Sequence, residues 1–314
     1  QNDEFGILEV GMDKKGEIDY LSKIIKPDVS VITNINYAHA KNFKNIKHIA
    51  LAKGEIINNI KKKGALILNA DDQFYKLHKQ HALKNKLNVY SFSMNKKNSY
   101  VTLNYIKKIK SKFKICVKIN NKKKYFFIKY NFENNLKNLL ATITIFSILN
   151  NVENLKKNIF YDFKILDGRG DINKIKIDKK NIFLIDESYN SNPLSLLSAI
   201  KNFDLIKTKK NKKHLILGDM LELGSHSKSL HSKFSKIINY SELDKVHIIG
   251  KDVKETYKNI NTKKKGLILN KTSQIINLIK NNINNNDYLM IKGSNSTGLN
   301  SFVNSIKKGN IHAL

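Results

Sequence analysis

The amino-acid sequence predicts an α/β protein with two domains, each built around a mainly parallel sheet. Apolar, β-branched runs alternate with segments of helical periodicity over residues 5–93 and again over residues 182–291. Such alternation is typical of parallel sheets whose strands are connected by helices. Residues 100–130 hold three short alternating runs instead, which indicates a small antiparallel sheet. The 314 residues are enough for two domains, which we place at 1–165 and 166–314.

The elements of the first domain follow from the spacing of its apolar residues. We expect strands at 5–10, 29–35, 65–69 and 89–93, and helices near 17–25, 47–57 and 73–81. The antiparallel sheet should use the runs 101–106, 113–119 and 124–128. A clear helix is expected at 135–149, followed by a second helix and exit segment at 151–165.

The second domain repeats the alternation five times, each strand being followed by a helical pattern. Its expected strands are 182–185, 214–217, 246–249, 267–269 and 288–291. This order of elements predicts a doubly wound, Rossmann-like domain.

Composition restricts the class of protein. The hydrophobic content of 41% is sufficient for folded cores, and no run of about 18 apolar residues exists, so no membrane-spanning helix is expected. The first residues do not form a signal peptide, and the one cysteine, Cys116, excludes an internal disulfide, which fits a reducing, cytoplasmic location. The chain has no initiator Met and an apolar run begins at Phe5, so we expect its beginning to be missing.

The net charge of +31 raises the possibility of a nucleic-acid partner. Lysines, however, occur in every segment, and no zinc-finger spacing or RNA-binding aromatic pattern accompanies them. Lys, Asn and Ile are abundant while Arg, Trp and Pro are scarce, which is typical of an AT-rich genome. We therefore expect no specific nucleic-acid partner.

His39 and Lys53 are the first candidate site residues. His39 follows the expected strand at 29–35, and Lys53 lies in the helix after it. Open α/β sheets bind ligands at the carboxyl ends of their strands, so both residues are well placed. With nine His and many Lys in the chain, a chance pairing remains an alternative.

Glu9 closes the first expected strand and is a candidate magnesium ligand, because Mg²⁺ takes one or two carboxylates together with phosphates and water. The spacing of Gly11 and Gly16 imitates a phosphate-binding loop, but Glu17 stands where that motif has Lys. The chain as given therefore has no P-loop.

Arg169 is the only Arg among 57 basic residues. Its planar, forked guanidinium suits a phosphate, although chance survival in a linker is the alternative. Asp186 follows a strand and could accept ribose hydroxyls, while Asn192 could be no more than the cap of a helix that starts at Pro193.

Two further strand ends carry polar or Gly-rich turns. One is GDMLELG at residues 218–224, which precedes a helix containing His231, and the other is Lys292 with Gly293 and Ser294. Polar turns at several strand ends of one domain predict a shared cleft.

Taken together, these segments resemble the Mur ligase family. The matching text is EVGMDKKGEI (9–18), PDVSVITNINYAHAKNF (27–43), AKGEI (52–56), LNADD (68–72), NNLKNLLA (134–141), GR (168–169), DESYNSNP (186–193), GDMLELG (218–224) with His231, and IKGSNSTGL (291–299). The segments run in the family order across nearly the whole chain. The resemblance implies a central ATPase domain of the P-loop type that is truncated before its P-loop, followed by the family's C-terminal domain.

The resemblance also implies roles for individual residues. The implied magnesium and catalytic residues are Glu9, His39 and Lys53, with Lys53 carbamylated by CO₂ and two Mg²⁺ ions bound. The implied ATP contacts are Asn135 and Asn138 near adenine, Arg169 at the γ-phosphate, Asp186 at the ribose, and Tyr189, Asn190 and Asn192 in the adjoining turn. Candidate substrate contacts are Asp219, Glu222, His231 and Lys292.

Within the family, AKGEI and GDMLELG resemble the member that joins D-alanyl-D-alanine to a UDP-N-acetylmuramoyl-tripeptide, with ATP, through an acyl phosphate. A monomeric cytoplasmic enzyme of peptidoglycan synthesis, cell shape and division is implied. The alternatives are a sister ligase, folylpolyglutamate synthase or a basic nucleic-acid-binding protein. The sequence departs from the family at Asn134, Asn36 and Tyr37, and without a P-loop we expect this chain alone to bind ATP poorly.

Overall fold

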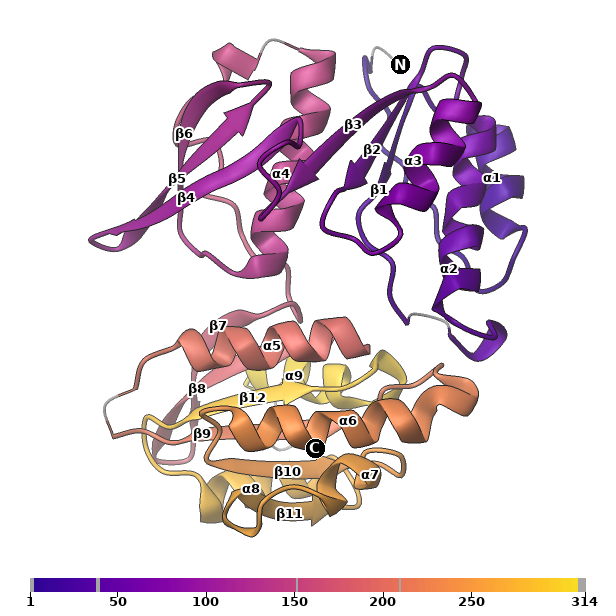
Figure 1. Ribbon diagram of the computed structural model, residues 1–314. Coiled ribbons are helices and arrows are strands. Elements are labelled where there is room, and N and C mark those ends of the chain that lie inside the picture. The colour runs from indigo at the N-terminus through magenta and orange to yellow at the C-terminus, as the bar shows by residue number, and fades with distance from the viewer. Residues whose placement is uncertain (1–2, 38–39, 151, 209, 310–314) are drawn as a thin grey trace. The chain divides into compact units, whose positions relative to one another are not determined.

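The computed structural model describes residues 3–37, 40–150, 152–208 and 210–309. The chain divides into two compact units, Gln1–Phe163 and Lys164–Leu314. Figure 1 shows the elements of each unit, which we describe separately.

The first unit contains one six-stranded sheet in the order β1-β2-β3-β4-β5-β6. Strands β1 to β4 pair in parallel and β4 to β6 antiparallel, so the expected antiparallel sheet is a continuation of the parallel one. The link is short, because β3 and β4 pair only through Phe92 with Val101 and Ser93 with Thr102. The strands are β1 Val29–Ile32, β2 Ala65–Asn69, β3 Asn88–Ser93, β4 Val101–Ile109, β5 Lys112–Ile119 and β6 Lys122–Ile128.

Helices α1 Glu17–Ile25, α2 Ile46–Lys53, α3 Tyr75–Lys84 and α4 Glu133–Leu149 accompany this sheet. Leu136, Leu140 and Ile143 recur at helical spacing on α4 and are buried in one core with Ile115 and Phe126 of the sheet. Helix α2 begins at Asn45, whose side chain accepts a hydrogen bond from the N–H of His48. The expected helix at 47–57 changes to a 3₁₀ helix over Gly54–Asn59.

Two expected elements of this unit are absent from the described residues. Residues 5–10 form no strand: β1 pairs with β2 alone, and Ile7 is 97% exposed. Residues 152–163 form a short 3₁₀ helix (Val152–Asn154) and turns rather than a helix of several turns. The reason is that this segment bonds to the edge of β6, where the N–H of Phe127 donates to the carbonyl of Lys157 at 2.8 Å.

The second unit has a six-stranded sheet in the order β11-β10-β9-β12-β8-β7. All neighbours pair in parallel except β7, which pairs antiparallel with β8. Strand β7 was not predicted, although its sequence DINKIKI alternates as an edge strand should. The strands are β7 Asp171–Ile177, β8 Lys180–Glu187, β9 Lys213–Gly218, β10 Lys245–Ile249, β11 Lys265–Leu269 and β12 Tyr288–Lys292.

Helices cover both faces of this sheet (Figure 1). Helices α8 Gln274–Asn282 and α9 Leu299–Lys307 share a core with Leu184, Ile216 and Leu289 of the strands. Helices α5 Pro193–Leu205, α6 Ser227–Tyr240 and α7 Lys254–Lys258 complete the unit, with α5 against α6 and α6 against α7. The turns at the carboxyl ends of β8, β9 and β12 are therefore neighbours. In the described part of the chain, no helix has the length and apolar character needed to cross a bilayer.

Candidate functional site

Lys53, the last residue of α2, is the best-defined candidate in the first unit. Its side chain is half-buried, and its Nζ donates to the backbone carbonyl of Asn34 at 3.3 Å. Burial lowers the pKa of this amine, while the carboxylate of Asp72 opposes that shift. A lysine with a lowered pKa is more often neutral at pH 7 and is then a nucleophile.

Asp72 and Asp71 are site residues that sequence reasoning missed. Asp72 accepts from the N–H of Ile35 at 2.8 Å and from that of Phe74 at 2.8 Å, so it ties the end of β1 to the turn before α3. Asp71 accepts from the hydroxyl of Ser93 at 2.7 Å. The two aspartates thus join the carboxyl ends of β1, β2 and β3, and the signal for them was LNADD directly after a buried strand.

Of the other expected metal ligands, only Glu9 lies within the described residues. Glu9 is exposed on a segment without regular secondary structure rather than at a strand end, and His39 lies outside the described residues. No group of three or more His, Cys, Asp or Glu residues that could hold a metal ion occurs within the described ranges. Asn135 is half-buried and Asn138 exposed near the start of α4, where three-residue spacing places them on one face.

In the second unit, Arg169 stands in a tight turn before β7. Its neighbours Gly168 and Gly170 have φ of 76° and 103°, and a Cβ on Gly168 would lie 2.8 Å from that of Tyr189. The N–H of Tyr189 donates to the carbonyl of Gly168 at 3.1 Å. The guanidinium of Arg169 consequently lies over the Tyr189 ring, 4.5 Å from its centroid.

Asp186 is completely buried at the end of β8, and its contacts are internal. One carboxylate oxygen accepts from the hydroxyl of Ser188 at 2.6 Å and the other from Lys307 Nζ at 2.5 Å. Lys307 also donates to Asp171 at 2.6 Å. Burial lowers the pKa of Lys307, but the two carboxylates outweigh it and the pKa is raised. Ribose binding by Asp186 stays a prediction.

Lys292 ends β12 and is 1% exposed. Its Nζ contacts Glu187 Oε2 at 3.2 Å and donates to the carbonyl of Asn190 at 3.0 Å. Burial lowers the pKa of Lys292 and raises that of Glu187, while each charge opposes the shift of the other. These contacts give Lys292 a positioning role for the turn after β8, and its contact with substrate stays a prediction.

That turn contains the remaining nucleotide candidates. Tyr189 and Asn190 are exposed, and the Asn190 side chain accepts from the N–H of Ser191 at 2.7 Å. Asn192 is the N-cap of α5: its side chain accepts from the N–H of Ser195 at 2.9 Å in a reciprocal capping box. The capping role considered for Asn192 is therefore present.

Asp219 organises the turn after β10. Its carboxylate accepts from the N–H groups of Lys251 at 3.0 Å and Val253 at 2.7 Å. His231, which is buried, accepts from the N–H of Met220 at 3.0 Å through Nε2, and its Nδ1 lies 2.9 Å from the carbonyl of Ser227. The neutral ring with the proton on Nδ1 satisfies both bonds.

The turns after β8, β9 and β12 are joined by Ser294. Its hydroxyl donates to the carbonyl of Ser191 at 3.2 Å and accepts from the N–H of Leu221 at 2.8 Å. Its own N–H donates to the carbonyl of Asp219 at 3.0 Å. The three turns therefore meet in this unit, with Glu222 exposed in the turn after β9. The shared cleft stays a prediction.

These features define an α/β protein with one mixed and one doubly wound sheet whose polar turns gather at strand ends. The model of the Mur ligase middle domain matches residues 1–146, and that of the Mur ligase, glutamate ligase domain matches residues 174–295. The chain belongs to the Mur ligase family.

Relatives and solved structures agree with this assignment. A UDP-N-acetylmuramoyl-tripeptide–D-alanyl-D-alanine ligase of Rickettsia prowazekii is 31% identical over 96% of this chain and 66% of its own length, and one of Bacillus subtilis is 31% identical over 80% and 52%. MurF of Acinetobacter baumannii, at 23% identity, has a TM-score of 0.80 over 95% of this chain and 63% of its own. MurF of Thermotoga maritima in complex with ADP, at 21%, has a TM-score of 0.79 over 96% and 66%. The predicted fold class is confirmed, and the chain spans about two thirds of the length of the R. prowazekii relative.

Proposed function

We propose that the chain belongs to an ATP-dependent, ADP-forming ligase that joins D-alanyl-D-alanine to UDP-N-acetylmuramoyl-tripeptide during peptidoglycan synthesis in the cytoplasm. The observation that carries the proposal is the shared name of the relatives. Those of R. prowazekii and Buchnera aphidicola from Acyrthosiphon pisum are 31% identical over 96% and 98% of this chain, and both are named for this reaction. We propose further that the enzyme is a monomer and that its reaction proceeds through an acyl phosphate.

Lys53 is the proposed reactive lysine. Its half-buried position lowers its pKa and so raises the fraction of neutral amine, which is the form that adds to CO₂ to give a carbamate. The resulting anion, with the carboxylate of Glu9 and the imidazole of His39, would supply ligands for two Mg²⁺ ions. Magnesium would neutralise charge on the phosphoryl group that is transferred from ATP.

The Arg169 turn is the proposed γ-phosphate contact. Stacking on Tyr189 fixes the plane of the guanidinium and leaves its N–H groups available at the edge, which is the geometry of bidentate phosphate binding. Asn135 and Asn138 are proposed to lie near adenine, with Asn190 and Asn192 in the adjoining turn. Asp219, Glu222, His231 and Lys292 remain proposed for the peptide substrates.

The test is acceptor-dependent ADP release by the complete gene product. With ATP, Mg²⁺ and the UDP-tripeptide, we expect release only when D-alanyl-D-alanine is added. Release with L-alanine, D-glutamate or a diamino acid, each with its matching precursor, would instead identify a sister ligase. Release with a folate and glutamate would identify a folylpolyglutamate synthase.

Replacement of Lys53 tests the proposed carbamate. Lys53→Ala should lower ADP release by on the order of 100-fold or more, because it removes an anion from the proposed metal site. Lys47→Ala is the matched control, since Lys47 is exposed on the same helix. Restoration of Lys53→Ala by short carboxylic acids would support the assignment, and equal activity of the two variants would refute it.

A further inference from the structure

The positive charge of the chain is concentrated in one region. Sixteen lysines and no acidic residue occur between Asp72 and Glu133. These 60 residues therefore carry +16 of the formal net charge of +31. Codon bias explains abundant lysine, but it does not explain the complete loss of acidic residues from a fifth of the chain.

Five of these sixteen lysines lie on one face of the β4–β6 sheet. Core residues such as Ile115, Val117 and Phe126 point to the face that packs with α4, so the residues that alternate with them point to the other face. Within the first unit, Figure 1 shows no helix against that second face. We call it the outer face; it includes Tyr105, Lys107, Ile109, Lys112, Lys114, Lys118, Lys123, Tyr125 and Phe127, with the buried Cys116 between Tyr105 and Tyr125.

Lysines lie directly opposite one another on the outer face. Lys107 pairs with Lys114 across β4 and β5, and Lys118 pairs with Lys123 across β5 and β6. Like charges in such positions destabilise a sheet. In the described part of the chain, none of the five outer-face lysines forms an ion pair. The outer face therefore carries repulsion that an external anion would relieve.

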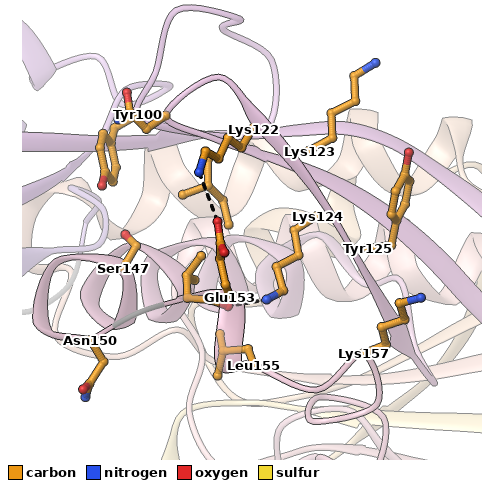
Figure 2. Close-up of a pocket in the computed structure, with 13 residues that line it drawn as sticks. Tyr100, Lys122, Lys123, Lys124, Tyr125, Ser147, Asn150, Glu153, Leu155 and Lys157 are labelled. Carbon is orange, nitrogen blue, oxygen red and sulfur yellow. Dashed lines mark hydrogen bonds and ion pairs between the residues drawn. The ribbon is translucent and has the colours of Figure 1, made fainter.

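The lysines at the adjacent edge of the sheet are neutralised differently. Lys122 forms an ion pair with Glu153 at 3.1 Å, and Lys124 donates to the carbonyl of Val152. Figure 2 shows both turned toward Glu153, in a pocket of about 610 Å³. Lys123 and Tyr125 also line this pocket, but their side chains point away from Glu153. Among the described residues, Lys122 and Lys124 at the edge thus have carboxylate or carbonyl partners, whereas no ion pair is formed by the outer-face lysines.

Two of the three aromatic rings of the outer face are already covered by cations. Lys114 Nζ is 4.4 Å from the centroid of the Tyr125 ring, and Lys112 Nζ is 4.0 Å from that of Phe127. Single-stranded nucleic acids bind by stacking bases on open ring faces in a groove. A broad sheet face with covered rings and distributed ammonium groups suits a flat anionic surface better.

We propose that the outer face binds the surface of a bilayer containing anionic lipids. A cluster of four to eight lysines is the usual size of such a site, and each cation near the surface contributes favourably. The half-exposed Tyr105 is a residue type enriched at membrane–water interfaces. The contact is peripheral and reversible, and it weakens as salt screens the charges.

The test is sedimentation of the protein with vesicles of phosphatidylcholine, with or without phosphatidylglycerol. We expect binding only to the anionic vesicles, with loss at high salt. The variant Lys107→Gln/Lys114→Gln/Lys118→Gln/Lys123→Gln should bind them more weakly by on the order of 100-fold. Because it removes both like-charge pairs, it should fold at least as stably as the parent protein.

The matched control is Lys228→Gln/Lys233→Gln/Lys236→Gln/Lys254→Gln, which removes the same charge from exposed positions in the second unit. It should retain vesicle binding. Equal weakening of both variants would show an effect of net charge alone and overturn the proposal. Failure to bind anionic vesicles, with outer-face-dependent binding of an oligothymidylate, would assign the face to nucleic acid instead.

Discussion

The ion pair of Lys292 and Glu187 affects the free energy of unfolding because its charges are largely shielded from water. Removing one partner leaves the other charge in a low-dielectric site, which typically costs about 3–5 kcal/mol. Lys292→Met should therefore lower the free energy of unfolding by about this amount, measured by urea denaturation with circular dichroism. Lys292→Met/Glu187→Gln should be less destabilised than Lys292→Met alone, because no buried charge remains unpaired.

The control pair has the same chemistry at the surface. Lys122 and Glu153 lie 3.1 Å apart, but their side chains are 84% and 63% exposed, against 1% and 15% for Lys292 and Glu187. Lys122→Met should leave the urea midpoint unchanged. A similar loss in Lys122→Met and Lys292→Met would show that burial is not the cause.

The buried imidazole of His247 makes the free energy of unfolding depend on pH. His214 and His247 stack with centroids 5.7 Å apart, and the N–H of Leu267 donates to His247 Nδ1 at 3.0 Å. Burial, with further lowering by His214 and Lys245, reduces the pKa of His247 from 6.5 to about 4. The unfolded chain therefore binds a proton that the folded chain does not. Stability should fall as pH drops from about 6.5 toward 4, by at most about 3 kcal/mol from this group.

The measurement is the urea midpoint at several pH values for the parent protein and for His247→Gln. Carboxylates with lowered pKa, such as those of Asp19 and Glu242, also lose their contribution in acid, so only the difference between the two curves isolates His247. The variant should show the shallower decline below pH 6.5. Parallel curves would contradict the assignment.

Sequence patterns could single out polar residues at turns and strand ends, but not the distant residues that bind them. Arg169 and Asp186 could be found because one is a unique residue type and the other follows an apolar strand. Lys307, which binds Asp186 from 121 positions away, has no local signal, since only the fold brings it there. The same holds for Lys292 as the partner of Glu187: the two residues are paired by strand register.

At the scale of elements, Glu55 connects two of them. Its carboxylate accepts from the N–H of Gly16 at 3.0 Å and from that of Asp19 at 3.3 Å, so it serves the open start of α1. Glu55→Ala should lower stability by about 1 kcal/mol. Glu55→Gln keeps an acceptor oxygen and should lose less. Hydrogen exchange of the α1 amides would report the effect locally, and unchanged exchange in Glu55→Ala would refute the capping role.

Elements were predicted well where packing and periodicity agree. Strand β2 has the expected bounds, and its five residues are all buried. Helix α1 also has the expected bounds, although Leu21 and Ile24 are exposed; it is flanked by Gly16 and Lys26, both in the left-handed conformation. Residues 5–10 have a strand-like composition but no pairing partner among the described residues, and composition alone cannot supply the hydrogen bonds of a sheet. In residues 152–163 the apolar side chains of Leu155 and Phe160 do pack on the core, but through turns rather than a helix.

At the scale of the whole molecule, the charge distribution changes the interpretation of composition. A total of +31 suggested a general bias, yet half of it lies in one fifth of the residues, and eight of the sixteen lysines there belong to β4, β5 and β6. The register of β4, β5 and β6 was needed to see this, because it determines which lysines share a face. The sequence alone shows that lysines alternate with apolar residues, but not which lysines of different strands lie on the same face.

The second unit should fold as an independent domain. Every described strand of its sheet pairs within the unit, and its core joins β8, β9 and β12 with α8 and α9. A fragment of residues 164–314 should therefore unfold cooperatively in urea. A fragment that begins at residue 180 would lose β7 and the Asp171 contact with Lys307, so it should be markedly less stable. Equal stability of the two fragments would show that β7 is dispensable, and a non-cooperative longer fragment would show that folding requires the first unit.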